Sequence, residues 1–115
     1  MTDVVQRMIS VARQSPSLKV TDSLRNDSAG MRLFAYAYLY ARPDAQLLLP
    51  LVEAVTDKED QPFGQYWGLQ AIGRVMAGAT QIPLIVKSKL QTLGARLQPG
   101  TDRDYELRKL LRQAG

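Results

Sequence analysis

Aromatic and arginine side chains recur at helical spacing in two segments of the chain, and together they have the chemistry of a binding surface. The candidate residues are Arg32, Tyr36, Tyr40, Phe63, Trp67 and Arg74. The first three are four residues apart and share one helix face, and the last three share a face of a later helix. Such side chains bury a large area while a polar tip remains paired, which is typical of interface hot spots. The alternative is that they pack helix against helix, with tyrosine hydroxyls bonded to neighbouring carbonyl groups.

An acidic turn offers carboxylates for a metal ion. Asp57, Glu59 and Asp60 lie within four residues of one another. The segment lacks the loop length, the central glycine and the alternating acids of a calcium-binding hand. We therefore expect a solvated turn and no metal site.

The composition excludes most catalytic chemistry, because the chain contains no cysteine and no histidine. Disulfides, thiolate nucleophiles, Cys/His zinc sites and imidazole catalysis are therefore impossible within it. Asp102, Asp104 and Glu106 stand where they complement the dipole of the last helix. Glu53 is the one carboxylate away from a predicted helix end or turn, and catalysis would need a second carboxylate beside it. We expect no enzymatic activity and no cofactor.

Basic residues gather towards the C-terminus and suggest a second kind of partner. Residues 1–73 carry 7 Lys or Arg against 8 Asp or Glu, whereas residues 74–115 carry 8 against 3. The basic set consists of Lys87, Lys89, Arg96, Arg103, Arg108, Lys109 and Arg112. These side chains can contact phosphates, so nucleic-acid binding is an alternative function. Only Tyr105 is interleaved with them, and no phosphate-binding glycine loop is present, which favours ordinary solvated helix faces.

Apolar residues at intervals of three and four predict that helices position all of these groups. The expected helices cover residues 3–14, 18–25, 29–41, 45–55, 62–77, 83–97 and 102–113. Asn26–Ser28 provides a cap for the third helix, and Pro62 fits the first position of the fifth. Pro50 either lies in the first turn of a helix that begins near Leu49 or bends a longer one. No segment has the alternation of a strand, so the fold class is all-α.

The expected helices pair into hairpins that repeat. Gly30 and Gly64 begin matching second helices 34 residues apart, and Tyr105 follows Tyr66 after 39 residues. Polar residues 56–61 form the turn inside the middle hairpin, and Gly78 is placed for a left-handed cap at its end. Intervals of this size are typical of two-helix solenoid units.

The middle hairpin resembles HEAT-like repeats. LLLPLVEAVTD is similar to the first helix of such a repeat with its terminal Asp, and FGQYWGLQAIGRV to the second helix with its glycine positions. Residues 64–66 depart from the usual valine–arginine pair, which Met31 and Arg32 preserve better. The chain length predicts one domain over residues 1–115. The resemblance covers about residues 18–113 and implies a short right-handed α-solenoid of about three antiparallel hairpins. It implies a non-enzymatic scaffold that binds another protein.

The first predicted helix, residues 3–14, has an apolar face that must be covered. Its apolar stripe consists of Val4, Val5, Met8, Ile9 and Ala12. Leaving this stripe in water is costly, so it must dock on residues 29–41 or on a second subunit. We favour a monomer, with a homodimer as the alternative. No apolar run is long enough for a membrane span and no secretory signal is recognisable, so we expect a cytoplasmic location.

Overall fold

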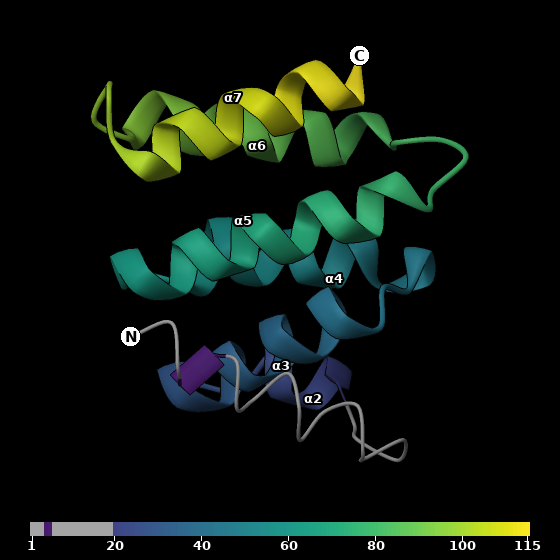
Figure 1. Cartoon of the computed structure of the whole chain (residues 1–115), viewed down its shortest axis with the longest axis vertical. Helices are drawn as coiled ribbons and strands as arrows, with labels where there is room; N and C mark the ends of the chain where they lie inside the picture. The colour runs from purple at the N-terminus through teal and green to yellow at the C-terminus, as the bar shows by residue number, and fades with distance from the viewer. Residues whose placement is uncertain (1–3, 6–19) are drawn as a thin grey trace.

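The helices stack in three layers, each made of two helices. A computed structural model describes residues 4–5 and 20–115. In Figure 1 the chain climbs from a layer of α2 and α3, through α4 and α5, to α6 and α7. Helix α5 packs against α3 on one side and α7 on the other, while α4 contacts both α2 and α6. The described residues are helical or irregular and contain no strand, which confirms the all-α prediction.

The first layer joins a short helix to a long one. Helix α2 covers Val20–Leu24 and α3 covers Ala29–Ala41. Ser28 caps α3, because its hydroxyl accepts a hydrogen bond from the backbone N–H of Met31 at 3.4 Å. The prediction for residues 29–41, including its cap, is confirmed.

The first half of the second layer is irregular. A 3₁₀ turn at Ala45–Leu47 leads into α4 at Leu48–Glu53, and a π turn follows at Ala54–Lys58. Pro50 lies in the first turn of α4, where its missing N–H costs no helical hydrogen bond. The π turn closes with the N–H of Glu59 donating to the carbonyl of Ala54 at 2.8 Å. Helical structure therefore extends into the segment that we predicted as a polar turn.

The remaining helices match their predicted positions closely. Helix α5 covers Pro62–Ala77, α6 covers Leu84–Arg96 and α7 covers Asp102–Ala114. The prediction for Gly78 is wrong, since this residue ends α5 with a φ of −95°, a right-handed conformation. Gly100, in the turn between α6 and α7, does adopt a left-handed conformation, with a φ of 84°.

The core runs continuously through the three layers. Leu39 of α3, Leu51 of α4, Ile72 of α5, Leu90 of α6 and Leu107 of α7 are all buried in one cluster. Polar contacts at the layer edges repeat as well: Lys58 Nζ lies 2.6 Å from Asp27 Oδ1, and Lys89 Nζ lies 2.7 Å from Asp57 Oδ2. Each lysine comes from one layer and each aspartate from the layer before it.

Most of the first predicted helix lies outside the described residues. Residue 3 and residues 6–14 of this predicted helix lie outside the described residues, and they include the stripe positions Met8, Ile9 and Ala12. Residues 18–19 of the predicted helix 18–25 lie outside them as well. Val5 is described and fully buried, and it packs in a small cluster with Ala37 of α3. Within the described part of the chain, no helix is both long enough and apolar enough to cross a membrane.

Candidate functional site

The six aromatic and arginine residues singled out in the sequence do not form a single surface. Arg32 and Tyr36 are buried, with exposed fractions of 4% and 0%. Tyr40, Phe63 and Trp67 are half-buried, and Arg74 is exposed. Arg32 and Tyr36 thus take the packing role that we left open as the alternative, while the other four reach the surface.

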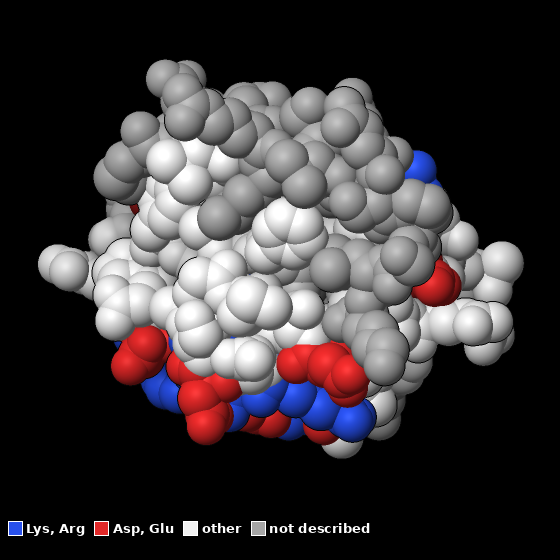
Figure 2. Space-filling view, turned by 90° about the horizontal axis from the view of Figure 1, so that it is seen from below, with Lys and Arg blue, Asp and Glu red and all other residues white. Residues whose placement is uncertain are grey.

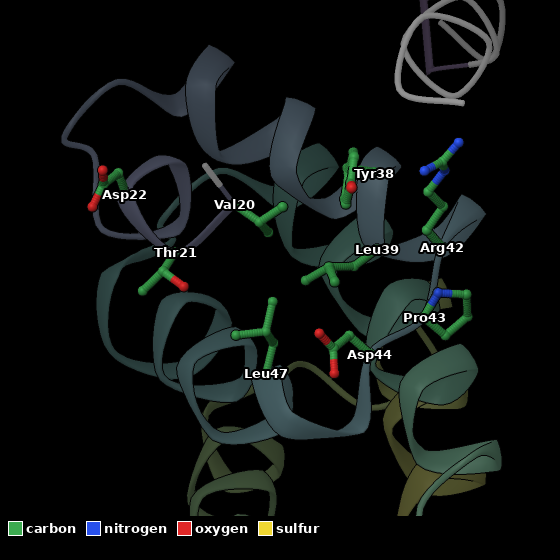
Figure 3. Close-up of a pocket in the computed structure, with 9 residues that line it drawn as sticks. All are labelled: Val20, Thr21, Asp22, Tyr38, Leu39, Arg42, Pro43, Asp44 and Leu47. Atoms are coloured by element: carbon green, nitrogen blue, oxygen red, sulfur yellow. The ribbon is translucent and has the colours of Figure 1, made fainter. Parts of the chain in front are cut away.

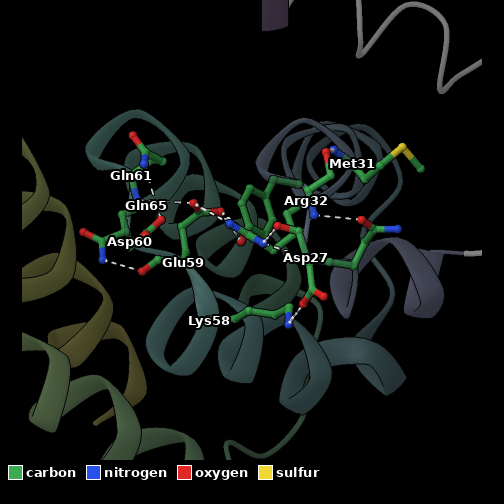
Figure 4. Close-up of polar contacts among 11 residues, drawn as sticks. Asp27, Met31, Arg32, Lys58, Glu59, Asp60, Gln61 and Gln65 are labelled. Carbon is green, nitrogen blue, oxygen red and sulfur yellow. Dashed lines mark hydrogen bonds and ion pairs between the residues drawn. The ribbon is translucent and has the colours of Figure 1, made fainter.

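The buried pair is held by Glu59 (Figure 4). Arg32 Nε donates to Glu59 Oε1 at 3.1 Å and Arg32 Nη2 donates to Oε2 at 3.2 Å. The hydroxyl of Tyr36 donates to Oε1 at 2.9 Å. Such a bidentate pair with a fixed geometry is the strong form of a buried ion pair. Glu59, which is 27 residues from Arg32 and 23 from Tyr36 in the sequence, therefore joins two neighbouring side chains of α3 in one hydrogen-bonded unit.

This unit extends to all three layers. Arg32 Nη1 donates to the carbonyl oxygens of Asn26 and Asp27, at 2.9 and 3.0 Å, in the α2–α3 turn. On the other side, Gln65 Nε2 donates to the carbonyl oxygen of Glu59 at 2.9 Å. Arg103 Nη1 of α7 then donates to Gln65 Oε1 at 2.7 Å. We call the set Arg32, Tyr36, Glu59, Gln65 and Arg103 the polar network.

Electrostatics follow from this burial. The hydrogen bonds to Glu59 raise the pKa of Arg32, with the negative charge of Glu59 acting in the same direction. Burial, followed by the nearby carboxylate charge of Glu59, raises the pKa of the Tyr36 hydroxyl. Both effects keep Tyr36 neutral and Arg32 charged throughout the neutral range.

The prediction of a solvated acidic turn is wrong for Glu59, because its side chain is fully buried. Asp60 is exposed as predicted, and Asp57 is exposed and paired with Lys89. The sequence signal for the burial of Glu59 is Gly64. A Cβ there would lie 2.7 Å from Glu59 Cδ, so a glycine is needed where the carboxylate crosses α5. No cluster of three or more candidate metal ligands occurs among the described residues.

A second group of side chains forms a partly exposed series across α3 and α5, which we call the aromatic face: Tyr40, Phe63, Tyr66, Trp67 and Arg74. The ring of Trp67 meets Tyr66 edge-on at 5.6 Å and Tyr40 edge-on at 6.0 Å between centroids. The guanidinium of Arg74 lies 4.9 Å from the centroid of the Tyr40 ring. Sequence reasoning missed Tyr66, although it is adjacent to Trp67 and could have been included for its side-chain type.

The N-terminal end of the chain contacts this face. Buried Val5 and Ala37 pack with half-buried Tyr40, Phe63 and Trp67. An intrachain contact therefore covers one part of the aromatic face. Of the predicted apolar stripe, Val5 docks on α3 as expected, whereas Val4 is 49% exposed, which corrects the prediction that it is covered.

Most of the basic C-terminal set is engaged within the molecule. Lys89 pairs with Asp57, Arg108 with Asp104 and Lys109 with Glu106. Arg96 donates to the carbonyl oxygen of Thr56 at 2.7 Å. Within the part of the chain that is described, Lys87 and Arg112 have no ion pair or side-chain hydrogen bond. Seen from the α2–α3 side, charges of both signs gather along one edge (Figure 2).

The α2–α3 end holds a pocket of about 650 Å³. Its apolar residues Val20, Leu39 and Leu47 point towards one another, whereas Asp22 and Asp44 lie on different sides of it (Figure 3). Because its charged groups do not converge, the pocket lacks the geometry of a catalytic or metal site. Glu53, the carboxylate away from predicted helix ends, is exposed on α4.

Comparisons with known proteins give no family for this chain. No protein-family model, no curated protein and no solved structure matches it. Function must therefore be inferred from the geometry of the aromatic face and the polar network.

Proposed function

We propose that this protein is a non-enzymatic interaction module that binds another protein through its aromatic face. The face brings together side chains of the types enriched in hot spots, Tyr, Trp and Arg, on two neighbouring helices. These rings already contact each other edge-on, so they offer a pre-ordered surface whose binding costs little side-chain entropy. This ordered and accessible ring series is the observation that carries the proposal.

We further propose that the fold is a short right-handed α-solenoid of HEAT-like hairpins. The three two-helix layers support this proposal, since the second helix of each layer packs against that of the next: α3 contacts α5, and α5 contacts α7. The recurring ion pair between successive layers, Asp27 with Lys58 and Asp57 with Lys89, also supports an internal repeat. Repeat proteins commonly bind partners along one extended face.

A monomer fits the proposal better than a homodimer. Val5 is fully buried by its own chain, which supports intrachain docking of the N-terminal stripe. Nucleic-acid binding by the basic set has weaker support. Most of these basic side chains are already bonded to carboxylates, to Gln65 or to a backbone carbonyl. Fewer free charges means fewer phosphate contacts and weaker binding.

Site-specific photo-crosslinking in the native host tests the proposed function. A photoreactive phenylalanine derivative replaces Tyr66 on the aromatic face or, as the matched control, Tyr105 on α7. Tyr105 is 61% exposed and holds the corresponding place in the next hairpin. We expect a discrete crosslinked protein from position 66 only, and loss of that product when Trp67→Ser is added.

Two outcomes contradict the proposal. One is equal labelling at positions 66 and 105, which means that crosslinking follows exposure alone. The other is a product at position 66 that persists undiminished with Trp67→Ser while circular dichroism shows an intact fold.

A further inference from the structure

A pocket opens beside the aromatic face, where the first turns of α5 and α7 meet. It encloses about 720 Å³ and is lined by side chains that include Phe63, Tyr66, Trp67, Asp102 and Arg103. A space of this size accepts a long side chain together with the adjoining peptide backbone. The pocket is thus a candidate site for one anchoring residue of a partner.

The apolar wall of the pocket is built from one turn of α5. Phe63, Tyr66 and Trp67 are three and four residues apart, and all three are half-buried. The edge-on contact of Tyr66 with Trp67 fixes the two rings at right angles, with an interplanar angle of 90°. A cation is attracted to the face of an aromatic ring, and most strongly to tryptophan. The wall therefore suits a flat cationic group as well as an apolar one.

The charges of the pocket decide whether a cationic or an apolar group fits it better. Asp102 is exposed at the first position of α7, and its carboxylate has no hydrogen bond or ion pair with any residue of 4–5 or 20–115. Arg103 also lines the pocket, but its Nη1 donates to Gln65 Oε1 at 2.7 Å, which holds the guanidinium against α5. Gln65 is neutral, so Arg103 keeps its charge and the pocket contains one charge of each sign, of which the Asp102 carboxylate is the one without a hydrogen-bond partner among the described residues. A positively charged ligand gains from Asp102 and must keep its charge on the Asp102 side of the pocket.

The molecule already contains one example of the expected contact. Arg74 lies over Tyr40 at 4.9 Å from the ring centroid, and Tyr40 contacts Trp67. One end of the ring series thus holds a guanidinium supplied by the chain itself. The other end, at Tyr66 and Phe63, is open and has a carboxylate next to it.

We propose that this pocket binds an arginine side chain of the partner protein, with the guanidinium stacked on the rings and paired with Asp102. The inference rests on the proposed function and adds the chemistry of the anchoring residue. Arginine fits better than lysine, because its planar group stacks on a ring while its N–H groups reach a carboxylate. The full chain provides its own probe, since Trp67 is its only tryptophan.

The test titrates the full chain with the capped peptide acetyl-Gly-Arg-Gly-amide. Trp67 fluorescence and ¹H–¹⁵N spectra follow binding. The control peptides replace arginine with citrulline, which has the same shape without the charge, or with glutamate. We expect shifts at Phe63, Tyr66 and Trp67, saturation by the arginine peptide, and binding about tenfold weaker for citrulline.

A pair of carboxylate variants locates the charge. Asp102→Asn weakens arginine-peptide binding about fivefold and reduces its dependence on salt, because the ion pair is lost. Glu53→Gln removes an equally exposed carboxylate on α4, outside the pocket, and leaves binding unchanged. Circular dichroism confirms that both variants keep the fold.

Several results overturn the proposal: equal binding of the arginine and citrulline peptides, preference for glutamate, absence of saturable shifts, or equal effects of the two carboxylate variants. Failure of this inference is distinguishable from failure of the proposed function. If the crosslink at position 66 survives Asp102→Asn while no arginine peptide binds, the interface stands and the arginine anchor falls. If the peptide binds but no crosslink forms, the pocket stands and the interaction module falls.

Discussion

The two ends of α3 use the same side chains in opposite ways. At its start, Arg32 and Tyr36 are buried and satisfied by Glu59. At its other end Tyr40 meets a second arginine, Arg74, but this pair is a cation–π contact at the surface. Tyrosine and arginine thus build a closed polar unit at one end and an open surface at the other.

The difference shows that burial, rather than residue type, assigns the role. Every buried side-chain nitrogen or oxygen among the described residues has a hydrogen-bond partner, so Arg32, Tyr36 and Glu59 form a closed buried unit. The rings of the aromatic face are only half-buried, so a partner can bury them further. The predictions below test this contrast, beginning with the largest effect.

Among these variants, Glu59→Gln should lower the free energy of unfolding the most, because it leaves the charge of Arg32 buried without a counter-ion. Removing one partner of a buried ion pair costs about 3–5 kcal/mol. Urea denaturation followed by circular dichroism measures the loss. The double variant Arg32→Met with Glu59→Leu should recover much of it, since no charge then remains buried. A loss below about 1 kcal/mol for Glu59→Gln would show that water reaches the pair.

Two glycines, Gly30 in the first turn of α3 and Gly64 in the first turn of α5, should respond with opposite signs to alanine. At Gly64 the new Cβ would lie 2.7 Å from Glu59 Cδ, so the buried carboxylate must move, at a cost of about 1–3 kcal/mol. At Gly30 the nearest atom is Ser28 Oγ at 3.7 Å, so alanine should stabilise by about 0.4–1 kcal/mol. Thermal unfolding compares the two variants. Destabilisation at both positions would mean that contact with Glu59 is not the cause.

Alkaline pH should weaken the polar network through Tyr36. Burial and the charge of Glu59 raise the pKa of Tyr36 in the folded protein, so the folded state keeps a proton that the unfolded chain loses. This contribution is fully present below about pH 10 and falls by about 1.4 kcal/mol per pH unit above it. The stability difference between wild type and Tyr36→Phe should therefore shrink as pH rises from 9.5 to 11, as measured by urea denaturation. A constant difference over this range would contradict the shift.

The smallest effect is expected at the open end. Arg74→Ala removes an exposed cation–π contact with Tyr40 and should cost only about 0.5–1 kcal/mol. The same variant should nevertheless reduce the crosslink at position 66, because a hot-spot side chain is lost. If Arg74→Ala destabilises the chain as much as Glu59→Gln, the two ends of α3 are equivalent and the comparison fails.

The sequence predicted the helices well because their signals are local. Ser28, Pro62 and Thr101 each stand directly before or at the first residue of a helix that the structure contains. The apolar spacing of α3 and α5 likewise depends only on neighbouring residues. The start of α4 at Leu48, with Pro50 in its first turn, agrees with one of the two predicted alternatives. The π turn at Ala54–Lys58 was not predicted, because its hydrogen-bonding pattern leaves no clear mark on residue types.

The candidate site was predicted only in part, because it depends on contacts between layers. Tyr40, Phe63, Trp67 and Arg74 reach the surface as expected, whereas Arg32 and Tyr36 do not. What separates the two groups is Glu59, which lies 27 positions from Arg32 in the chain. No periodicity links residues across such a separation, so a charged side chain in a polar segment was assigned to solvent.

The π turn at Ala54–Lys58 gives this part of the chain a strict length requirement. Its closing hydrogen bond, from Glu59 to Ala54, spans five residues where an α-helix spans four. The turn thus accommodates one additional residue, and each helical residue turns the side-chain direction by about 100°. Deleting a single residue here would make the Glu59-to-Ala54 hydrogen bond an ordinary α-helical one and change the direction in which the Glu59 side chain leaves the turn towards Arg32. An insertion or deletion within residues 54–58 would therefore move the Glu59 carboxylate relative to Arg32, even when every side chain of the polar network is retained.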